Sequence, residues 1–183
     1  MDSSFGMLVH VIVLLTSRIR SKSIFSLAFF GMLIAHLGIA VFILGATVTT
    51  QLGIEKDIKM NVGESQNIAG YDFVFNGVSR HEENNYKGFK GVLTVLKNNK
   101  EVVRLYPEKR QYQTGMPMTE AAIDPSISRD LYVALGESLG GGAWSVRIYY
   151  KPLVRWIWLG GLMIALGALF AAIDRRYFLR IKS

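Results

Sequence analysis

Residues Ile24–Val48 read IFSLAFFGMLIAHLGIAVFILGATV and contain no Asp, Glu, Lys or Arg. As an α-helix this stretch would extend about 37 Å, more than the hydrocarbon core of a bilayer, which is about 30 Å thick. A second apolar run, Trp156–Ile173, is bounded by Arg155 on one side and by Asp174 and Arg175 on the other. The sequence therefore predicts two transmembrane helices.

The basic residues lie next to the apolar runs. None of the formal net charge of +7 comes from Gln51–Tyr150, which contains 12 Lys plus Arg and 12 Asp plus Glu, so nucleic-acid binding is disfavoured. Basic residues precede the first run and follow the second: Arg18, Arg20 and Lys22, then Arg175, Arg176, Arg180 and Lys182. The positive-inside rule places both flanks in the cytoplasm and the middle segment outside, and Lys151 and Arg155 count only weakly against this.

The N-terminal run Phe5–Thr16 is apolar but only 12 residues long, which is short for a spanning helix. Asp2 rather than a basic region precedes it, so a signal peptide is not expected. An interfacial helix, a re-entrant segment and the end of a transmembrane helix all remain open, and we favour the last.

The chain has no cysteine. This excludes disulfides, Cys-ligated zinc, iron–sulfur clusters and thiol redox chemistry. Any metal chemistry has to rest on histidine or carboxylate groups.

The segment between the apolar runs is predicted to be β-structure, because short apolar stretches alternate with turn residues. We expect five to seven strands forming a small antiparallel barrel or sandwich, OB-like as one option. The clearest strands are 71–75, 91–97, 101–106, 130–135 and 143–150, with a hairpin turn at Asn98-Asn99-Lys100. The glycines Gly136, Gly140, Gly141 and Gly142 favour a hairpin connection over a phosphate loop, because no Lys-Ser or Lys-Thr follows them.

His36 lies at the midpoint of the first apolar run, where an imidazole needs a partner. It is a packing device, an axial haem ligand or a proton-relay group, and we favour a function over packing. Gly31, Ala35 and Gly38 line a face beside it that a helix or a flat macrocycle could approach closely. In the second run, Gly161, Ala165, Ala168 and Ala172 form a small-residue stripe that indicates helix contact within a larger bundle, although small residues are common in membrane helices.

The aromatic residues Trp144, Tyr149, Tyr150, Trp156 and Trp158 cluster where the outer segment re-enters the membrane, and they are predicted to form an aromatic belt.

Two further histidines carry weaker predictions. His81, beside Glu82 and Glu83, is interpreted as part of a solvated loop rather than as a metal ligand. His10 lies in the short N-terminal run. No Ser/His/Asp set or paired carboxylates indicate a hydrolytic site.

Three segments, together with Ala35-His36-Leu37-Gly38, resemble a known family: GMPMTEAAID (115–124), RDLYVALGE (129–137) and WSVRIYYKPLVRWIW (144–158). The chain from about Ser23 to its C-terminus is similar to the C-terminal part of the CcmF family, the haem lyase subunit of the System I cytochrome c maturation machinery. The resemblance implies a polytopic protein of the bacterial inner membrane that receives haem from the haem chaperone CcmE. It then attaches that haem to the Cys-x-x-Cys-His motif of apocytochrome c, together with other maturation subunits.

His36 matches an intramembrane histidine of this family, which implies an axial ligand of a b-type haem. Gly31, Ala35 and Gly38 are then expected to lie close to that cofactor. The family's tryptophan-rich segment, its two periplasmic histidines and its first intramembrane histidine would precede Ser23, and nothing in the sequence matches them. We therefore expect a fragment or one half of a split protein that does not ligate haem alone.

The resemblance and the charge pattern together divide the chain into five expected segments. These are the end of a membrane helix with a cytoplasmic loop (1–22), a transmembrane helix carrying His36 (23–50), a periplasmic β-domain (51–150), a transmembrane helix (151–174) and a cytoplasmic tail (175–183). Two other functions remain open. One is a non-enzymatic membrane scaffold that recruits partners, and the other is a transporter or proton-relay subunit in which His36 titrates.

Overall fold

The structure is a computed structural model that describes residues 26–83, 85–112 and 115–174. The described residues divide into two compact units, one formed by residues 26–40 and 159–174, the other by those of Val41–Trp158. The element order is α2 (Leu27–Leu52), β1 (Ile54–Met60), β2 (Ser65–Ile68), β3 (Tyr71–Glu82), β4 (Tyr86–Lys97), β5 (Lys100–Leu105), β6 (Glu108–Tyr112), β7 (Met118–Glu120), β8 (Ala122–Pro125), β9 (Arg129–Gly140), β10 (Ala143–Pro152) and α3 (Val154–Ile173).

The helices α2 and α3 are each long and apolar enough to cross a membrane. The structure thus confirms the two predicted helices. Helix α2 continues to Leu52, past the expected end of the apolar run at Val48, and α3 begins at Val154 only after β10 has ended at Pro152.

The two helices meet along glycines that recur every seven residues of α2, at Gly31, Gly38 and Gly45. A Cβ atom built on Gly31 would lie 2.5 Å from the carbonyl oxygen of Gly167, and one on Gly38 would lie 2.9 Å from that of Gly160. A Cβ on Gly45 would lie 2.8 Å from a backbone nitrogen of α3. The backbones therefore approach so closely that any side chain would clash, and we call this contact the glycine seam.

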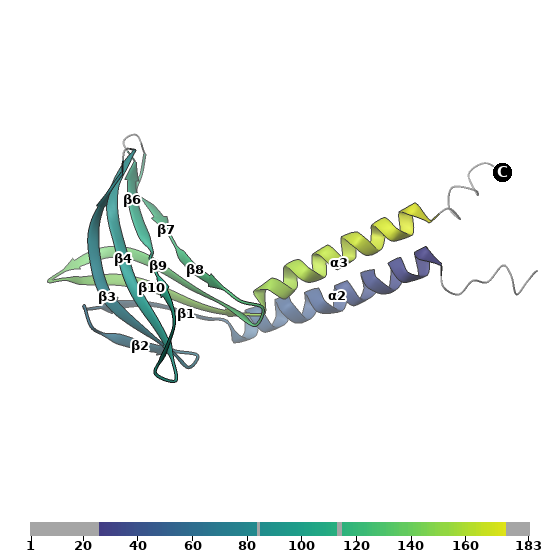
Figure 1. Cartoon of the computed structure of the whole chain (residues 1–183), viewed down its shortest axis with the longest axis horizontal. Helices are drawn as coiled ribbons and strands as arrows, with labels where there is room; N and C mark the ends of the chain where they lie inside the picture. The colour runs from purple at the N-terminus through teal and green to yellow at the C-terminus, as the bar shows by residue number, and fades with distance from the viewer. Residues whose placement is uncertain (1–25, 84, 113–114, 175–183) are drawn as a thin grey trace, which may run out of the picture. The chain divides into compact units, whose positions relative to one another are not determined.

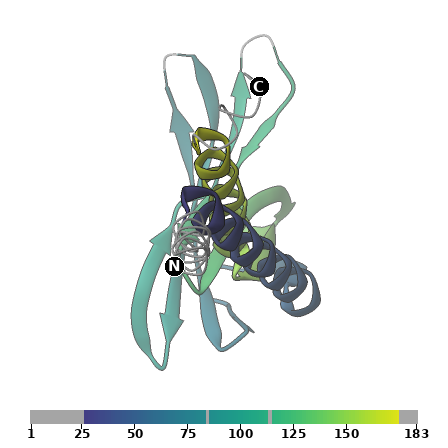
Figure 2. The same cartoon turned by 90° about the vertical axis from the view of Figure 1, so that its right-hand side faces the viewer.

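The carboxylate of Asp174, which follows the last residue of α3, caps the N-terminus of α2. The backbone N–H of Ala28 donates to Oδ2 of Asp174 at 2.8 Å, and Asp174 is buried. Figure 2 shows the start of α2 beside the end of α3. Because the first N–H groups of a helix have no partner within it, Asp174 supplies a cap from a different helix and a favourable negative charge.

The β-domain is an antiparallel sandwich of two sheets (Figure 1). One sheet has the order β1-β10-β9-β8, and the other has the order β2-β3-β4-β6-β7 with β5 paired to β4. The structure confirms the sandwich among the predicted options. Because the sheets are separate, the barrel and OB-like options are wrong, and ten strands occur in the described residues rather than five to seven.

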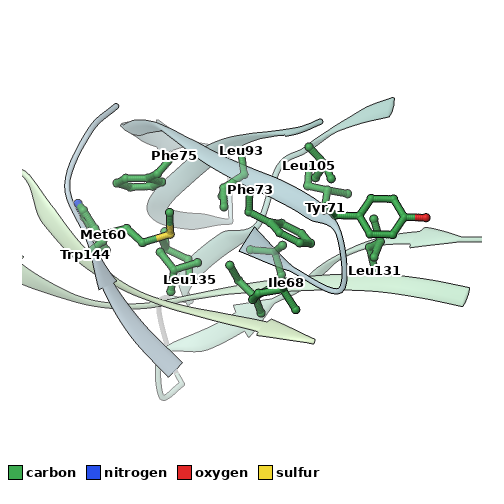
Figure 3. Close-up of a cluster of buried hydrophobic side chains, with 14 residues drawn as sticks. Met60, Ile68, Tyr71, Phe73, Phe75, Leu93, Leu105, Leu131, Leu135 and Trp144 are labelled. Atoms are coloured by element: carbon green, nitrogen blue, oxygen red, sulfur yellow. The ribbon is translucent and has the colours of Figure 1, made fainter. Parts of the chain in front are cut away.

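The core lies between the inner faces of the two sheets and is built by residues that alternate along each strand. Phe73 and Phe75 of β3 and Leu131 and Leu135 of β9 have no exposed surface. Figure 3 shows these side chains together with Met60 of β1. Burial of such side chains, at about 1.5–3 kcal/mol each, is what holds the sheets together.

The two predicted hairpin connections are present. Asn98 and Asn99 adopt φ angles of 52° and 59° between β4 and β5, the left-handed pair that a tight hairpin turn requires. Gly140, Gly141 and Gly142 turn β9 into β10, also with positive φ. The hairpin connection is therefore confirmed for these three glycines, whereas Gly136 lies within β9, where a Cβ atom would lie 2.9 Å from the Cβ of Ser145 on β10.

The glycine seam yields a prediction with a matched control. Gly167→Ala should destabilise the helix pair by about 1–3 kcal/mol, because its methyl group meets the backbone of α2. Gly161→Ala, on the same helix, has nothing within 4 Å of the new methyl group and should be neutral or slightly stabilising. Thermal unfolding of the detergent-solubilised chain, followed by circular dichroism, measures both. Equal effects of the two variants would contradict the seam.

Candidate functional site

His36 lies on an exposed face of α2 with one ring nitrogen already engaged. Its Nδ1 lies 2.8 Å from the backbone carbonyl oxygen of Met32, one turn earlier. Because a carbonyl oxygen only accepts, Nδ1 carries the proton of this hydrogen bond, and in the neutral ring Nε2 keeps its lone pair. Within the described part of the chain no hydrogen bond is made to Nε2. This is the arrangement in which a histidine can ligate a metal through Nε2.

The expected close-approach face beside His36 is occupied by α3. Gly31 and Gly38 are buried in the glycine seam, and a Cβ on Gly167 would lie 2.6 Å from the backbone nitrogen of Ala35. The sequence left this face open to a helix or to a macrocycle, and a helix fills it. The expected cofactor contact of Gly31, Ala35 and Gly38 is therefore corrected to helix packing.

The small-residue stripe of α3 faces away from α2. Gly161, Ala165, Ala168 and Ala172 are all exposed. Gly160 and Gly167, which make the seam, lie on a different face of the same helix. A Cβ on Gly161 would have nothing within 4 Å, so this position makes no contact with α2, and the role of the stripe in a larger bundle stays a prediction.

The predicted aromatic belt separates into two groups. Trp144 is only 8% exposed and belongs to the core of the β-domain, so its assignment to the belt is wrong. Trp156 and Trp158 lie in the first turns of α3, and Trp158 is highly exposed. Tyr149 lies on β10, edge-on to Tyr132 with ring centroids 5.0 Å apart, and the belt role of this group stays a prediction.

The other two histidines differ from His36. His81 lies in β3 rather than in a loop, and its Nε2 lies 3.3 Å from Oε1 of Glu83. No cluster of three potential metal ligands occurs in the described residues. His10 lies outside the residues that the structure describes.

The β-domain carries a hollow of about 350 Å³, which we call the basic groove. It is lined by residues of both sheets and of the segment before β7: Arg80, Lys87, Gly88, Phe89, Lys109, Arg110, Gln111, Pro117, Glu137, Ser138 and Trp144. Phe89 of β4 and Trp144 of β10 meet with ring centroids 5.1 Å apart. This aromatic pair joins the two sheets and gives the groove an apolar floor.

Gly88 allows the strands beneath the groove to approach each other. A Cβ atom at this position would overlap the backbone carbonyl oxygen of Lys109 on β6. Gly88 pairs with Arg110 in the register of β4 and β6. A residue without a side chain is therefore required where β4 pairs with β6 at the groove.

The charged residues that line the basic groove are four cations, Arg80, Lys87, Lys109 and Arg110, and one carboxylate, Glu137. Three of these cations are in ion pairs: Lys87 with Glu82, Lys109 with Glu137 and Arg110 with Glu108. The guanidinium of Arg80 makes no hydrogen bond or ion pair within the described part of the chain. Arg110 lies over the ring of Tyr86, 4.7 Å from its centroid. Cations above an apolar floor suit a partner that presents acidic and apolar groups together.

Glu108 holds two of the cations near the groove. Its carboxylate lies 2.9 Å from Nε of Arg110 and 3.2 Å from Nζ of Lys90, and it accepts a 3.3 Å hydrogen bond from the hydroxyl of Tyr86. Burial raises the pKa of Glu108, but the hydrogen bonds from Arg110 and Lys90 outweigh it, and the pKa lies below the usual 4.5. The charged form is therefore the one that the fold stabilises.

Sequence reasoning did not find the basic groove. Its residues are spread over five strands, and the segment 51–150 has no net charge that would draw attention to them. The one local pattern that could have indicated the groove is Gly88-Phe89-Lys90-Gly91. There an aromatic residue on a strand is flanked by glycines and a lysine. Finding the groove required the pairing of β4 with β6 and the packing of β4 on β10.

Comparison with known proteins gives a consistent result. The family model described as "CcmF C-terminal beta-sandwich" matches residues 51–152. The cytochrome c-type biogenesis protein CcmF of Pseudomonas fluorescens is 51% identical over 158 residues, covering 85% of this chain and 24% of that protein. CcmF of Escherichia coli is 48% identical over 162 residues, covering 88% of this chain and 25% of that protein.

A solved structure also matches. The structure titled "Cytochrome c Heme Lyase CcmF" superposes with a TM-score of 0.63 at 20% sequence identity, covering 79% of this chain and 24% of that one. At this identity the match supports the fold alone. The chain spans about a quarter of the length of the curated relatives it matches.

The buried carboxylate next to the groove should make stability pH-dependent. Because the pKa of Glu108 is depressed in the fold, its contribution is present above the usual value of 4.5 and is lost as pH falls through the folded value. Glu108→Gln should lower the free energy of unfolding by about 1–3 kcal/mol at pH 7 and weaken this acid dependence. Glu101→Gln removes an exposed pair with Arg104 and should cost less than about 1 kcal/mol. Chemical denaturation at pH 7 and pH 4 measures both variants.

Proposed function

The chain belongs to the CcmF family, and we propose that it serves cytochrome c maturation as the C-terminal part of a haem lyase subunit. The reaction to be served joins the haem vinyl groups to two substrate thiols as thioethers. The match of the whole β-domain to the CcmF model carries this proposal. The chain itself contains no cysteine that could compete with the substrate thiols.

We propose that His36 is one axial ligand of a b-type haem, and the residues present fit that role. The hydrogen bond from Nδ1 to Met32 fixes the ring and leaves Nε2 as the ligating nitrogen on an exposed face. A haem bound there would supply one-electron redox chemistry. A second ligand of that haem would have to come from another helix.

The β-domain is proposed as a docking surface for the haem chaperone CcmE, apocytochrome c and other maturation subunits. The basic groove supports this, because it offers an apolar floor with cations at its rim. A non-enzymatic scaffold would use the same groove. Haem binding at His36 is what distinguishes the lyase subunit from that scaffold.

The chain is a membrane protein, and we propose that it lies in the bacterial inner membrane with the β-domain in the periplasm. The basic flanks at Arg18–Lys22 and Arg175–Lys182 support cytoplasmic ends. The β-domain lies between the two helices in sequence, so it has to be on the opposite side if both helices span.

The haem proposal is tested by the reduced-minus-oxidised visible spectrum of the purified complex that contains this chain. The wild-type complex should give a b-type signal, and His36→Ala should abolish it because the axial nitrogen is lost. His81→Ala is the matched control and should leave the spectrum unchanged, since His81 lies in the β-domain. An unchanged spectrum for His36→Ala would exclude the ligand role and favour the scaffold.

Topology is tested independently, because a chain without native cysteine allows single cysteines to be placed. A cysteine replacing Asn99, at the exposed turn between β4 and β5, should react with a membrane-impermeant maleimide added to the periplasmic side. Ser183→Cys should react only after the inner membrane is opened. The reverse pattern would overturn the proposed orientation. It would not bear on the proposal that His36 ligates haem.

A further inference from the structure

The loop Ser126–Ser128 joins β8 to β9 and is fastened to the beginning of α3. The indole Nε1 of Trp156 donates to the carbonyl oxygen of Ile127 at 3.1 Å. The backbone N–H of Leu153 donates to the carbonyl oxygen of Ser128, also at 3.1 Å. Two hydrogen bonds thus hold a loop of the sandwich beside the first turn of an apolar helix.

A charged side chain adds a third link to this loop. Oδ1 of Asp130 accepts from the backbone N–H of Ser126 at 3.1 Å and lies 3.4 Å from Nε of Arg155. Asp130 therefore links the loop, through Ser126, to α3, through Arg155. The position of the loop relative to the start of α3 is fixed by these contacts, all of which lie within the unit Val41–Trp158.

The tip of the loop exposes a large apolar side chain. Ile127 is 78% exposed, and Trp158 on the adjoining helix is also 78% exposed. A single exposed apolar residue on a protein surface is ordinary. Here, however, Ile127 is hydrogen-bonded to the third residue of a helix that is long and apolar enough to span a bilayer.

The level of Ile127 along the membrane normal follows from its partner. Tryptophan prefers the interface, where its ring is apolar and its N–H finds an acceptor, and Trp156 finds that acceptor in Ile127. Trp158 lies about 3 Å further along the helix axis. The exposed cations Lys151 and Arg155 lie at the end of β10 and in the first turn of α3. Lipid phosphates at the membrane interface would attract both.

We propose that Ile127 inserts into the boundary between lipid headgroups and acyl chains, so that the β-domain contacts the bilayer through the loop Ser126–Ser128 as well as through its two helices. The occupant of this apolar surface is phospholipid. Continuity with the spanning helix α3 and the cations beside it are the observations that select lipid. The proposal is independent of whether His36 binds haem.

The experiment places one environment-sensitive fluorophore, NBD, on the full chain in phospholipid vesicles. Ile127→Cys carries the label at the loop, and Leu139→Cys carries it at an exposed apolar position before the β9–β10 turn. Both side chains are exposed, so neither substitution empties the core. The label at position 127 should show blue-shifted emission that a lipid-borne nitroxide quenches and aqueous iodide does not. The label at position 139 should show the opposite.

Three results would overturn the proposal. Emission at position 127 that iodide quenches as it does at position 139 would place the loop in water. Blue-shifted emission that neither quencher reaches would show that another protein segment covers Ile127. Equal lipid quenching at both positions would show that contact with the bilayer is not specific to the loop Ser126–Ser128.

Discussion

The absence of side chains along the glycine seam is the constraint on which the membrane part of this protein depends. In lipid no hydrophobic force draws helices together, so close packing and dispersion have to hold them. Gly31 and Gly38 on α2 and Gly160 and Gly167 on α3 provide that packing by letting the backbones touch. Because α3 takes this face of α2, His36 is left on the exposed surface with Nε2 available.

The β-domain depends on a different force, the burial of alternating apolar side chains between two sheets. Its connection to the helices is nevertheless specific. The hydroxyl of Thr49 donates to the carbonyl oxygen of Pro152 at 2.7 Å, and Leu153 turns the chain with a φ of 53° before α3 begins. The end of α2 and the end of β10 are thereby tied to each other, and both helices leave the sandwich from one junction.

Helices and strands that depend on local sequence could be predicted. Features that depend on which distant strands pair could not. The length of the apolar runs indicated the helices correctly, and the alternation in Tyr71–Phe75 indicated a strand correctly, but neither distinguished a sandwich from a barrel. Strand β1 was missed because its residues are mostly exposed and its partner is β10, so that Ile54 pairs with Tyr150. Trp144 was placed in the belt because it is near Trp156 in sequence, yet the eight residues of β10 up to Pro152 carry it about 26 Å from the end of the strand.

The helix face used for packing illustrates the same limit. One residue turns a helix by about 100°, so Gly160 and Gly161 lie on different faces although the sequence hardly distinguishes them. Only the position of α2 shows that Gly160 is the contact and that Gly161 begins an exposed small-residue stripe. Helix α3 thus keeps a second surface suited to close packing, and α2 keeps an imidazole nitrogen without a partner among the described residues. Exposed surfaces of these two kinds support the proposal that His36 acts together with helices beyond this pair.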